Sequence, residues 1–383
     1  MSQAAIISLY YKNFNFGGQL QSFALQRKIE KLNIECEQIC INRKQQSELL
    51  SIIEIIKHSD FKEIVSRVIG RILRYCSYVV LFRDRAAIMK RDKKTFDFSL
   101  TVPHTSTVYD EDTIKKIAND YSTFIVGSDC VWYINESSEL TGLSFVGENR
   151  HKISYAASLG CAAIPDGWAE KYIKNIAKFD AIAVREKSIA AELQELIPQK
   201  KVNVTVDPVL LFNASEWNEF LPDVNIKEKY ALIYILSEDR KQCLEAQKWA
   251  RDNGMKAVVF PHIRRRIVYW QKNFGDIRDF SSGPLEFVSL IKNADVILTD
   301  SFHASVFSVI FHKPFFAFMR ETEKGFVGRV ENFLEEIGLS KQLISVDNLA
   351  NIKSIPEIDF SFSDSIIEQK RRESINYLKE NIV

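Results

Sequence analysis

AIISLYYKNFNFGGQLQSFALQRKIEKL, residues 5–32, has the pattern of a strand, a turn and a helix in succession. The apolar run AIISLY predicts the strand, and the segment NFGG predicts a tight turn after it. Leu25, Ile29 and Leu32 then recur at helical spacing. The stretch therefore predicts a β-turn-α unit.

The same alternation continues along the chain. Further strands are predicted at 36–41, 124–126, 152–157, 180–184, 202–206, 230–236, 256–260, 295–300 and 314–318. Helices are predicted up to about residue 94, after Pro165, from Lys187, at 241–251 and at 285–292. Alternation at this spacing predicts parallel sheets.

The chain is long enough for two domains. Its 383 residues exceed what one hydrophobic core usually supports. The rhythm breaks after Pro208 and resumes with the strand at 230–236, so we predict Rossmann-like doubly wound domains at 1–210 and 211–383 with a cleft between them. A charged helical segment, with Ser363 and Asp364 as start signals, ends the chain and could cross back onto the first domain.

Composition argues against several classes of protein. With 46% hydrophobic and 26% charged residues, the chain has the balance of a soluble globular protein. A net charge of +1 gives no support to nucleic-acid binding. The apolar runs are shorter than the roughly 20 residues of a membrane span. Six scattered Cys without a CxxC, and no leader pattern at the start, predict a cytoplasmic protein.

Six segments together resemble the polysaccharide pyruvyl transferase family. They are NFGGQLQSFALQ (15–26), FIVGSDCVW (124–132), KISYAASLG (152–160), AVREKS (183–188), VDPVLLF (206–212) and LTDSFHASVFSVIFHKPFFAF (298–318). The likeness runs in order from about residue 5 to about 340, and the SFH segment is its most specific part. The family often has Gln in place of Cys130 and Gly in place of Ala304. The resemblance implies a fold like the two-domain glycosyltransferases called GT-B.

The resemblance also implies a reaction. Family members move the enolpyruvyl group of phosphoenolpyruvate onto two hydroxyls of a hexose or hexosamine in a glycan, lipid-linked or polymeric, and form a pyruvate ketal for capsule or exopolysaccharide. Two alternatives stay open: glycosyl transfer from a nucleotide sugar on the same architecture, and a glycan-binding module without catalysis. Ketal formation needs an acid, a base and cations that bind the anionic donor, but no cofactor.

His303 is the candidate general acid. It lies between the strand that ends near Asp300 and the next helix, where open α/β sheets bind ligands, and imidazole can donate a proton near neutral pH. A lone His is more often structural, but this position and the resemblance favour catalysis. Ser301 and Ser305, with the N–H groups of the helix start, are expected to bind phosphate. Alternatively, Asp300 or Ser301 only caps the helix.

Arg185 and Asp129 follow two strands of the first domain. The planar guanidinium of Arg185 suits a carboxylate or phosphate, and the alternative is an ion pair with an acid such as Asp207. We expect Glu186 to orient Arg185. Asp129 is the candidate base for the acceptor hydroxyl, with Ser128 beside it, since Gly127 permits a sharp turn. An Asx turn or helix cap is the alternative for Asp129.

The glycine turn is a candidate binding loop. Gly17 and Gly18 allow close backbone approach to donor or acceptor, and Gln19 and Gln21 are expected to bind sugar hydroxyls. The turn lacks the GxGxxG fingerprint, so no NAD binding is inferred.

Two cations downstream of the SFH segment complete the predicted site. Arg329 is the better candidate for neutralising phosphate, because Lys313, just before a Pro, can instead cap a helix end. No spacing of His or Cys supports a metal site.

A basic region at about 48–94 is predicted as a helical insertion in the first domain, on the acceptor side. Residues 62–94 carry ten Lys or Arg against three acidic residues. Such a surface suits the inner face of an anionic membrane, where family members meet acceptors on a polyprenyl diphosphate. The alternative is a solvated insertion packed on the first domain. HIRRR (262–266) is a weaker candidate for diphosphate contact.

Overall fold

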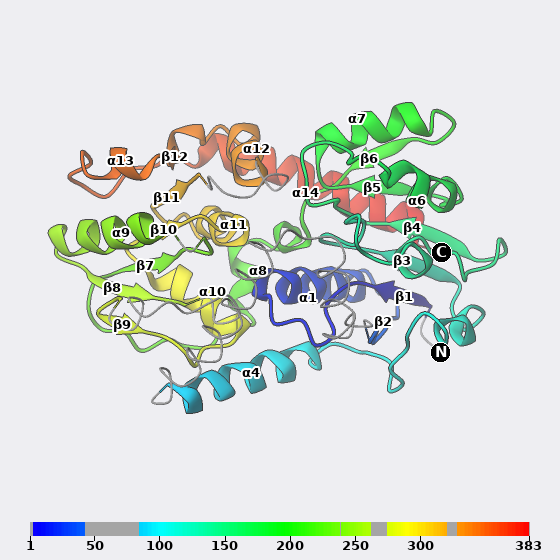
Figure 1. Ribbon diagram of the computed structural model, residues 1–383, viewed down its shortest axis with the longest axis horizontal. Helices are drawn as coiled ribbons and strands as arrows, with labels where there is room; N and C mark the ends of the chain where they lie inside the picture. Colours follow the sequence, from blue (N-terminus) through cyan, green and yellow to red (C-terminus); the bar gives the residue numbers. More distant parts are fainter. Residues whose placement is uncertain (1–2, 43–83, 238, 262–273, 320–327, 383) are drawn as a thin grey trace, which may run out of the picture.

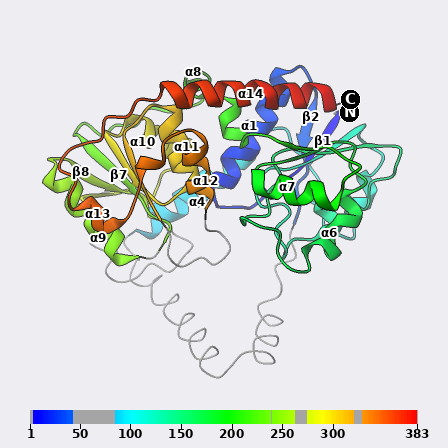
Figure 2. The same cartoon turned by 90° about the horizontal axis from the view of Figure 1, so that it is seen from above.

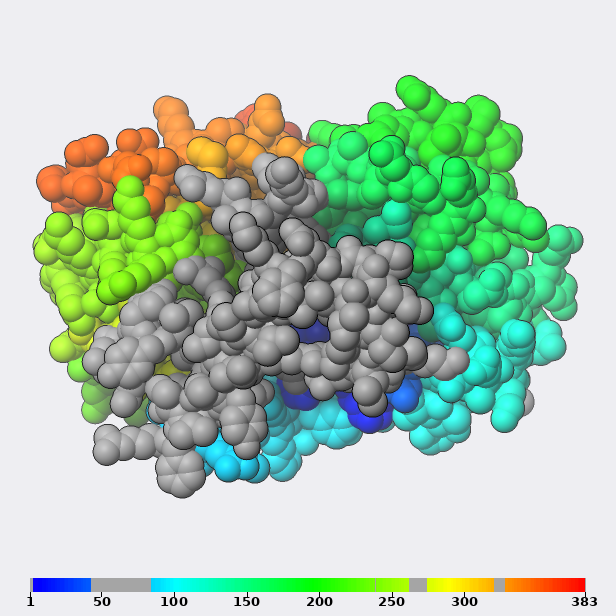
Figure 3. All heavy atoms as spheres, viewed as in Figure 1, coloured from blue at the N-terminus to red at the C-terminus, as the bar shows by residue number. Residues whose placement is uncertain are grey.

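The computed structural model describes residues 3–42, 84–237, 239–261, 274–319 and 328–382 as two parallel α/β units (Figure 1). Green atoms of the first unit adjoin orange atoms of the second in the upper middle of the space-filling view (Figure 3). Most of the basic region at 48–94, and the cluster at 262–266, lie outside the described residues.

The first unit contains the glycine turn and a parallel sheet in the order β2-β1-β3-β4. Strands β5 and β6 pair with each other, and isolated bridges between β4 and β5 continue the row. The bounds are β1 Ala4–Ile7, α1 Phe16–Lys31, β2 Cys36–Gln38, α4 Arg85–Ser99, β3 Thr123–Val126, α5 Ser138–Thr141, β4 His151–Ser154, α6 Trp168–Ile176, β5 Ile182–Val184, α7 Lys187–Leu196, β6 Val202–Val204 and α8 Ala214–Asn218. β1, β3 and β5 are buried throughout, because helices cover both faces of the sheet.

The second unit has a six-stranded parallel sheet in the order β12-β11-β10-β7-β8-β9. Its elements are β7 Tyr230–Tyr234, α9 Arg240–Asp252, β8 Lys256–Val259, β9 Ile277–Arg278, α10 Pro284–Asn293, β10 Val296–Thr299, α11 Phe302–Ile310, β11 Phe315–Phe318, α12 Arg329–Glu336, β12 Leu343–Ile344, α13 Val346–Leu349 and α14 Ser361–Asn381. The strand order reverses between β7 and β10. Each strand predicted from the sequence is present, whereas the two-residue strands β9 and β12 gave no signal.

Helix α1 links the cores of the two units. Its first residue, Phe16, belongs to the first unit, yet its ring lies 5.4 Å from that of Phe260 and 5.7 Å from that of Phe287 in the second. One apolar cluster therefore runs through both units. The N-terminus of α1 is consequently fixed at the interface.

Helix α4 is the described end of the predicted basic insertion, and it packs on both units. Arg91 donates to the carbonyl of Pro261 (2.7 Å), and its guanidinium lies 4.0 Å from the centre of the Phe260 ring. On the side of the first unit, the rings of Phe23 and Phe98 lie 5.1 Å apart. This end of the segment therefore packs on the first unit, as the alternative has it, and on the second unit as well.

Helix α14 crosses from the second unit to the first (Figure 2). Near its end the Tyr377 hydroxyl donates to the carbonyl of Ser154 (2.9 Å), and Ser374 Oγ accepts from the N–H of Val206 (3.0 Å). The helix begins at Ser361, before the predicted start signals. Ser363 instead donates to the carbonyl of Ile337 (2.9 Å), so its hydroxyl anchors the helix and does not cap it.

Candidate functional site

The loops that follow β7 and β10 are tied together at the carboxyl edge of the second sheet. The Asp300 carboxylate accepts from the N–H groups of Leu236 (2.6 Å) and Ser237 (2.8 Å). Ser301 caps α11, because its side chain accepts from the N–H of Ala304. Of the two residues considered as the cap, Ser301 is therefore the one used. The first turn of α11 lies where the strand order reverses.

His303, in this first turn, contacts both units. Its side chain is 13% exposed, and its Nε2 lies 3.6 Å from Oδ2 of Asp207 in the first unit. On its other side the ring abuts α1, where a Cβ on Gly17 would lie 2.2 Å from Nδ1. Gly17 is required here because any side chain would displace the imidazole. The N-termini of α1 and α11 thus meet at His303.

Asp207 is a buried carboxylate that lies beside both Arg185 and His303. Its Oδ2 accepts from Nη1 of Arg185 at 2.7 Å, and its Oδ1 accepts from the N–H of Val209 at 3.2 Å. Burial alone would raise the pKa of Asp207, but His303 and Arg185 outweigh burial and hold this pKa well below its ordinary value. A carboxylate in this position orients an imidazole and stabilises its imidazolium form.

Arg185 lies among three carboxylates. Besides the bond to Asp207, its Nε donates to Oε1 of Glu186 (3.2 Å), its Nη2 donates to Oγ of Ser158 (3.0 Å), and Asp129 Oδ1 lies 3.8 Å from Nη1. Burial alone would lower the pKa of Arg185, but the carboxylates raise it above its ordinary value. The ion pair left open as an alternative is present. Arg185 is therefore largely occupied by protein groups.

Asp129 faces the first turn of α1. Its backbone has φ of 66°, a left-handed conformation that non-glycine residues adopt rarely. A Cβ on Gly18 would lie 3.5 Å from its Oδ2. The preceding Gly127 has φ of 136° and lies so close to the carbonyl of Tyr155 that a Cβ would clash, as expected of the sharp turn predicted there.

Arg329 reaches this position from the second unit. It is the first residue of α12, and its Nη1 lies 3.9 Å from the sulfur of Cys130. Burial raises the pKa of the Cys130 thiol to about 12, and Asp129 adds to the shift. Arg329 therefore approaches a neutral thiol next to the candidate base.

Three predicted substrate-binding side chains are buried and bonded to the protein. Gln19 donates to two carbonyls of the loop after β1. Gln21 accepts from the N–H of Ser128 (3.2 Å), and Ser128 Oγ donates to the carbonyl of Ala156 (2.8 Å). At 2%, 1% and 0% exposure respectively, Gln19, Gln21 and Ser128 support the turns and do not face a ligand, contrary to the prediction.

Ser305 is buried within α11, and Lys313 lies at the other edge of the sheet. Ser305 is fully buried and donates to the carbonyl of Ser301 (3.0 Å). Lys313 precedes β11, whose Phe315 pairs with Ile297 near the start of the parallel strand β10. Lys313 is thus at the amino edge of the sheet, opposite His303, and burial lowers its pKa. Their predicted contacts with phosphate are wrong for this geometry.

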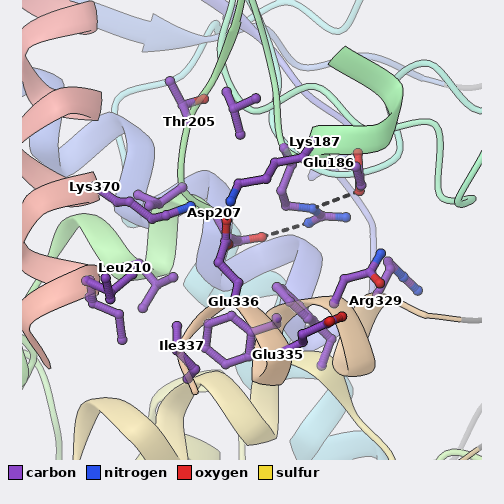
Figure 4. Close-up of a pocket in the computed structure, with 18 of the residues that line it drawn as sticks. Glu186, Lys187, Thr205, Asp207, Leu210, Arg329, Glu335, Glu336, Ile337 and Lys370 are labelled. Carbon is purple, nitrogen blue, oxygen red and sulfur yellow. Dashed lines mark hydrogen bonds and ion pairs between the residues drawn. The ribbon is translucent and has the colours of Figure 1, made fainter. Parts of the chain in front are cut away.

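A cavity of about 700 Å³ lies between α7, α12 and α14 (Figure 4). Arg185 and Asp207 line it, whereas His303 is not among its described lining residues. Glu336 of α12 forms ion pairs there with Lys187 of α7 (2.7 Å) and with Lys370 of α14. Burial would raise the pKa of Glu336, but the two lysines lower it. This size is typical of small-molecule sites.

Two residues have more contacts in the site than the sequence indicates. From the sequence, Asp207 is expected only as an ion-pair partner and Glu186 only as a support for Arg185. The signal for Asp207 was its position after the strand at 202–204, which pairs in parallel with the strand before Arg185. Parallel strands end at one edge, so these two side chains had to be neighbours.

Neither a metal site nor a membrane span is found in the part of the chain that the structure describes. No group of three or more His, Cys, Asp or Glu in it is placed to hold a metal ion. None of its helices combines the length and apolarity needed to cross a bilayer.

Solved structures with this architecture include sugar-nucleotide enzymes. UDP-GlcNAc 2-epimerase from Methanocaldococcus jannaschii is 14% identical, with a TM-score of 0.53 over 96% of this chain and 99% of that one. A putative UDP-N-acetylglucosamine 2-epimerase from Listeria monocytogenes is 12% identical, with a TM-score of 0.51 over 100% and 92%. UGT89C1 from Arabidopsis thaliana, complexed with UDP-L-rhamnose, is 9% identical, with a TM-score of 0.51 over 100% and 99%. These likenesses show a GT-B-like fold alone.

Sequence comparisons match the chain to one family model. No curated protein matches the chain significantly. The family model described as polysaccharide pyruvyl transferase matches residues 15–322.

Proposed function

We propose a function from the premise that this chain belongs to the polysaccharide pyruvyl transferase family. The protein transfers the enolpyruvyl group of phosphoenolpyruvate to two hydroxyls of a hexose or hexosamine in a bacterial glycan and forms a pyruvate ketal. The acceptor is carried on a polyprenyl diphosphate at the inner membrane face, and the product enters capsule or exopolysaccharide.

One observation carries this proposal: two helix N-termini from different units meet at a histidine backed by a buried carboxylate. The N-termini of α1 and α11 carry partial positive charge and N–H groups that suit an anion. His303 lies between them, in contact with Gly17 and 3.6 Å from Asp207. An anionic enol substrate that must be protonated on carbon fits this combination of charge and acid.

The first chemical step is proton transfer to the methylene carbon. His303 donates the proton, and Asp207 stabilises and orients its imidazole. The carbon that bears phosphate becomes electron-deficient, and an acceptor hydroxyl forms a C–O bond to it. Asp129, at 16% exposure and in the left-handed turn beside α1, takes the hydroxyl proton.

The second step closes the ketal. The C–O bond to phosphate breaks, the second hydroxyl attacks the same carbon, and its proton leaves with the phosphate. The proton that Asp129 took from the first hydroxyl replaces the proton that His303 gave to the methylene carbon. Arg329 and the start of α11 neutralise the departing phosphate, while Arg185 holds Asp207, Glu186 and Asp129 in register.

The test combines two donors. The protein is incubated with a synthetic lipid-linked sugar and either phosphoenolpyruvate or a panel of nucleotide sugars, and the acceptor mass is measured. A gain of one pyruvate less water, with phosphate release, is expected. A hexose gain would establish glycosyl transfer instead, the reaction that shares this fold.

A matched pair of variants tests the acid. His303→Asn should abolish ketal formation, whereas His312→Asn should not. His312 is an exposed histidine whose Nε2 lies 2.9 Å from Asp364. Equal activity in both variants would contradict the assignment of His303.

A further inference from the structure

Glu186 is one of the residues that line the cavity between α7, α12 and α14, and one of its carboxylate oxygens is buried and unpaired among the described residues. Its side chain is only 8% exposed. Oε1 accepts from Ser158 Oγ (2.6 Å) and from Arg185 Nε (3.2 Å). Among the residues that the structure describes, Oε2 has no hydrogen-bond partner. A buried carboxylate oxygen without a donor is costly, and Glu186 is one of the residues that line the cavity, so a ligand there that supplied an O–H or N–H group to Oε2 would relieve this cost.

The charges of the cavity disfavour an anion. Carboxylates from all three surrounding helices line it: Glu186, Glu335, Glu336 and Glu373, together with Asp207. Three of the four cations in the lining are paired with these acids: Lys187 and Lys370 with Glu336, and Arg185 with Glu186 and Asp207. The fourth, Arg329, is the one assigned above to the donor phosphate. A phosphate or carboxylate ligand would meet these acidic groups. An uncharged ligand with several hydroxyls would not.

The remaining lining suits a sugar ring. Phe302 and Phe333 line it edge to face, with ring centres 5.7 Å apart, and a flat aromatic face such as that of Phe333 can cover the C–H face of a pyranose. Neutral hydrogen-bonding side chains, among them Ser188, Asn332 and Gln369, complete the wall. A volume of about 700 Å³ accommodates one or two such rings.

We propose that this cavity is the subsite for the uncharged acceptor sugar, with Glu186 Oε2 accepting a hydrogen bond from one of its hydroxyls. The proposal rests on the proposed function, since it assigns the acceptor of that reaction. It also gives the two substrates separate surroundings. The anionic donor lies against the helix N-termini at His303, and the neutral sugar lies among carboxylates.

The arginine between them connects the two subsites. Arg185 bonds Glu186 through Nε and Asp207 through Nη1, and Asp207 in turn lies 3.6 Å from His303. A hydroxyl on Glu186 is therefore held in fixed relation to the acid. This arrangement explains why Arg185 is occupied by protein groups and does not serve as the donor clamp.

Direct sugar binding, without phosphoenolpyruvate, tests the proposal. Saturation-transfer NMR is recorded for the full chain with methyl glycosides of hexoses and N-acetylhexosamines at tens of millimolar. Glu186→Gln places an amide donor at the Oε2 position and should weaken binding at least about tenfold. Gln369→Trp, a change on the exposed face of α14, should fill the cavity and abolish binding. Glu331→Gln, an exposed change on α12 outside the cavity lining, is the matched control and should bind within about twofold, as expected of a surface change.

Phosphorus NMR of phosphoenolpyruvate on the same variants checks folding and the donor site. Gln369→Trp should bind the donor as the unmodified chain does. The proposal is overturned if no glycoside binds the unmodified chain, if sugar binding survives both Glu186→Gln and Gln369→Trp, or if Gln369→Trp loses the donor. Hexose transfer from a nucleotide sugar, combined with loss of sugar binding in Gln369→Trp, would sink the proposed function and leave the sugar subsite standing.

Discussion

Asp207 and Glu186 are both bonded to Arg185, yet only one of them is fully satisfied. Asp207 uses Oδ2 for Arg185 and His303 and Oδ1 for the N–H of Val209. Glu186 uses Oε1 for Ser158 and Arg185 and leaves Oε2 unpaired among the described residues. One arginine therefore bonds to two different carboxylates. We call Asp207, whose two oxygens are both paired, the closed carboxylate, and Glu186, whose Oε2 is unpaired among the described residues, the open carboxylate.

This difference suggests that Asp207 positions its neighbours, whereas Glu186 can bind a ligand. A carboxylate with every oxygen occupied can only orient its neighbours, and the low pKa of Asp207 keeps it ionised for that role. A carboxylate with a vacant oxygen can accept a bond from a ligand. The two side chains thus predict different kinetic effects when each charge is removed.

The largest effect is expected from Asp207→Asn. The variant keeps the size of the side chain but removes the charge beside His303, so kcat for ketal formation should fall about 10³-fold with little change in KM for phosphoenolpyruvate. The pH dependence of kcat should change too, because Asp207 acts through the imidazole. Glu186→Gln should mainly raise KM for the acceptor. Equal losses of kcat in Asp207→Asn and Glu186→Gln would contradict the assignment of different roles to the two carboxylates.

Gly17→Ala should be the next most damaging change. The new Cβ would lie 2.2 Å from His303 Nδ1, so the imidazole must move away from Asp207. A displacement of this order commonly costs about 10²-fold in kcat. Gly18→Ala is the comparison, because its Cβ would meet Asn13 Nδ2 at 3.0 Å and Asp129 Oδ2 at 3.5 Å, and the loss should be smaller. A larger loss of kcat in Gly18→Ala than in Gly17→Ala would indicate that the position of Asp129 matters more than that of His303.

The fold was predictable because its signals are local. The runs 230–234 and 296–298 are apolar throughout, as in strands covered on both faces, and both lie in strands of one parallel sheet. The position of His303 at the carboxyl edge of the second sheet was predictable for the same reason, since the residues that follow a strand in a parallel sheet lie at that edge.

The failures concern burial, which depends on distant parts of the chain. Gln19 and Gln21 resembled sugar-binding amides, but α1 is packed between the units and both amides bond to the backbone. Lys313 lies close to His303 in sequence, yet the intervening helix returns the chain to the opposite edge. Glu186 showed no sign of its open oxygen, since that depends on α12 and α14 enclosing the cavity.

Ser374→Ala tests the support of Asp207 from α14. The change removes the hydroxyl that accepts from the buried N–H of Val206, the residue before Asp207. The free energy of unfolding should fall by about 1–3 kcal/mol, the cost of an unsatisfied buried donor. Urea denaturation measures it, with the exposed Arg372→Ala on the same helix as control. If kcat falls while KM for the acceptor holds, α14 supports the closed carboxylate more than the open one; no loss of stability would contradict the role of this bond.

The smallest effect concerns Glu336, a third carboxylate, which two lysines satisfy at the edge of the cavity. Because its pKa is lowered in the folded protein, its stabilising effect is complete above the ordinary glutamate value of about 4.3 and is lost as pH falls through the lower folded value. The difference in unfolding free energy between the unmodified chain and Glu336→Gln should therefore be constant from about pH 6 to 8 and shrink below about pH 4. Salt should reduce it, since Lys187 is 67% exposed. A difference that grows on acidification would mean that the pKa of Glu336 is raised on folding. Glu336 would then not be satisfied by its lysines, and it would resemble Glu186 more than Asp207.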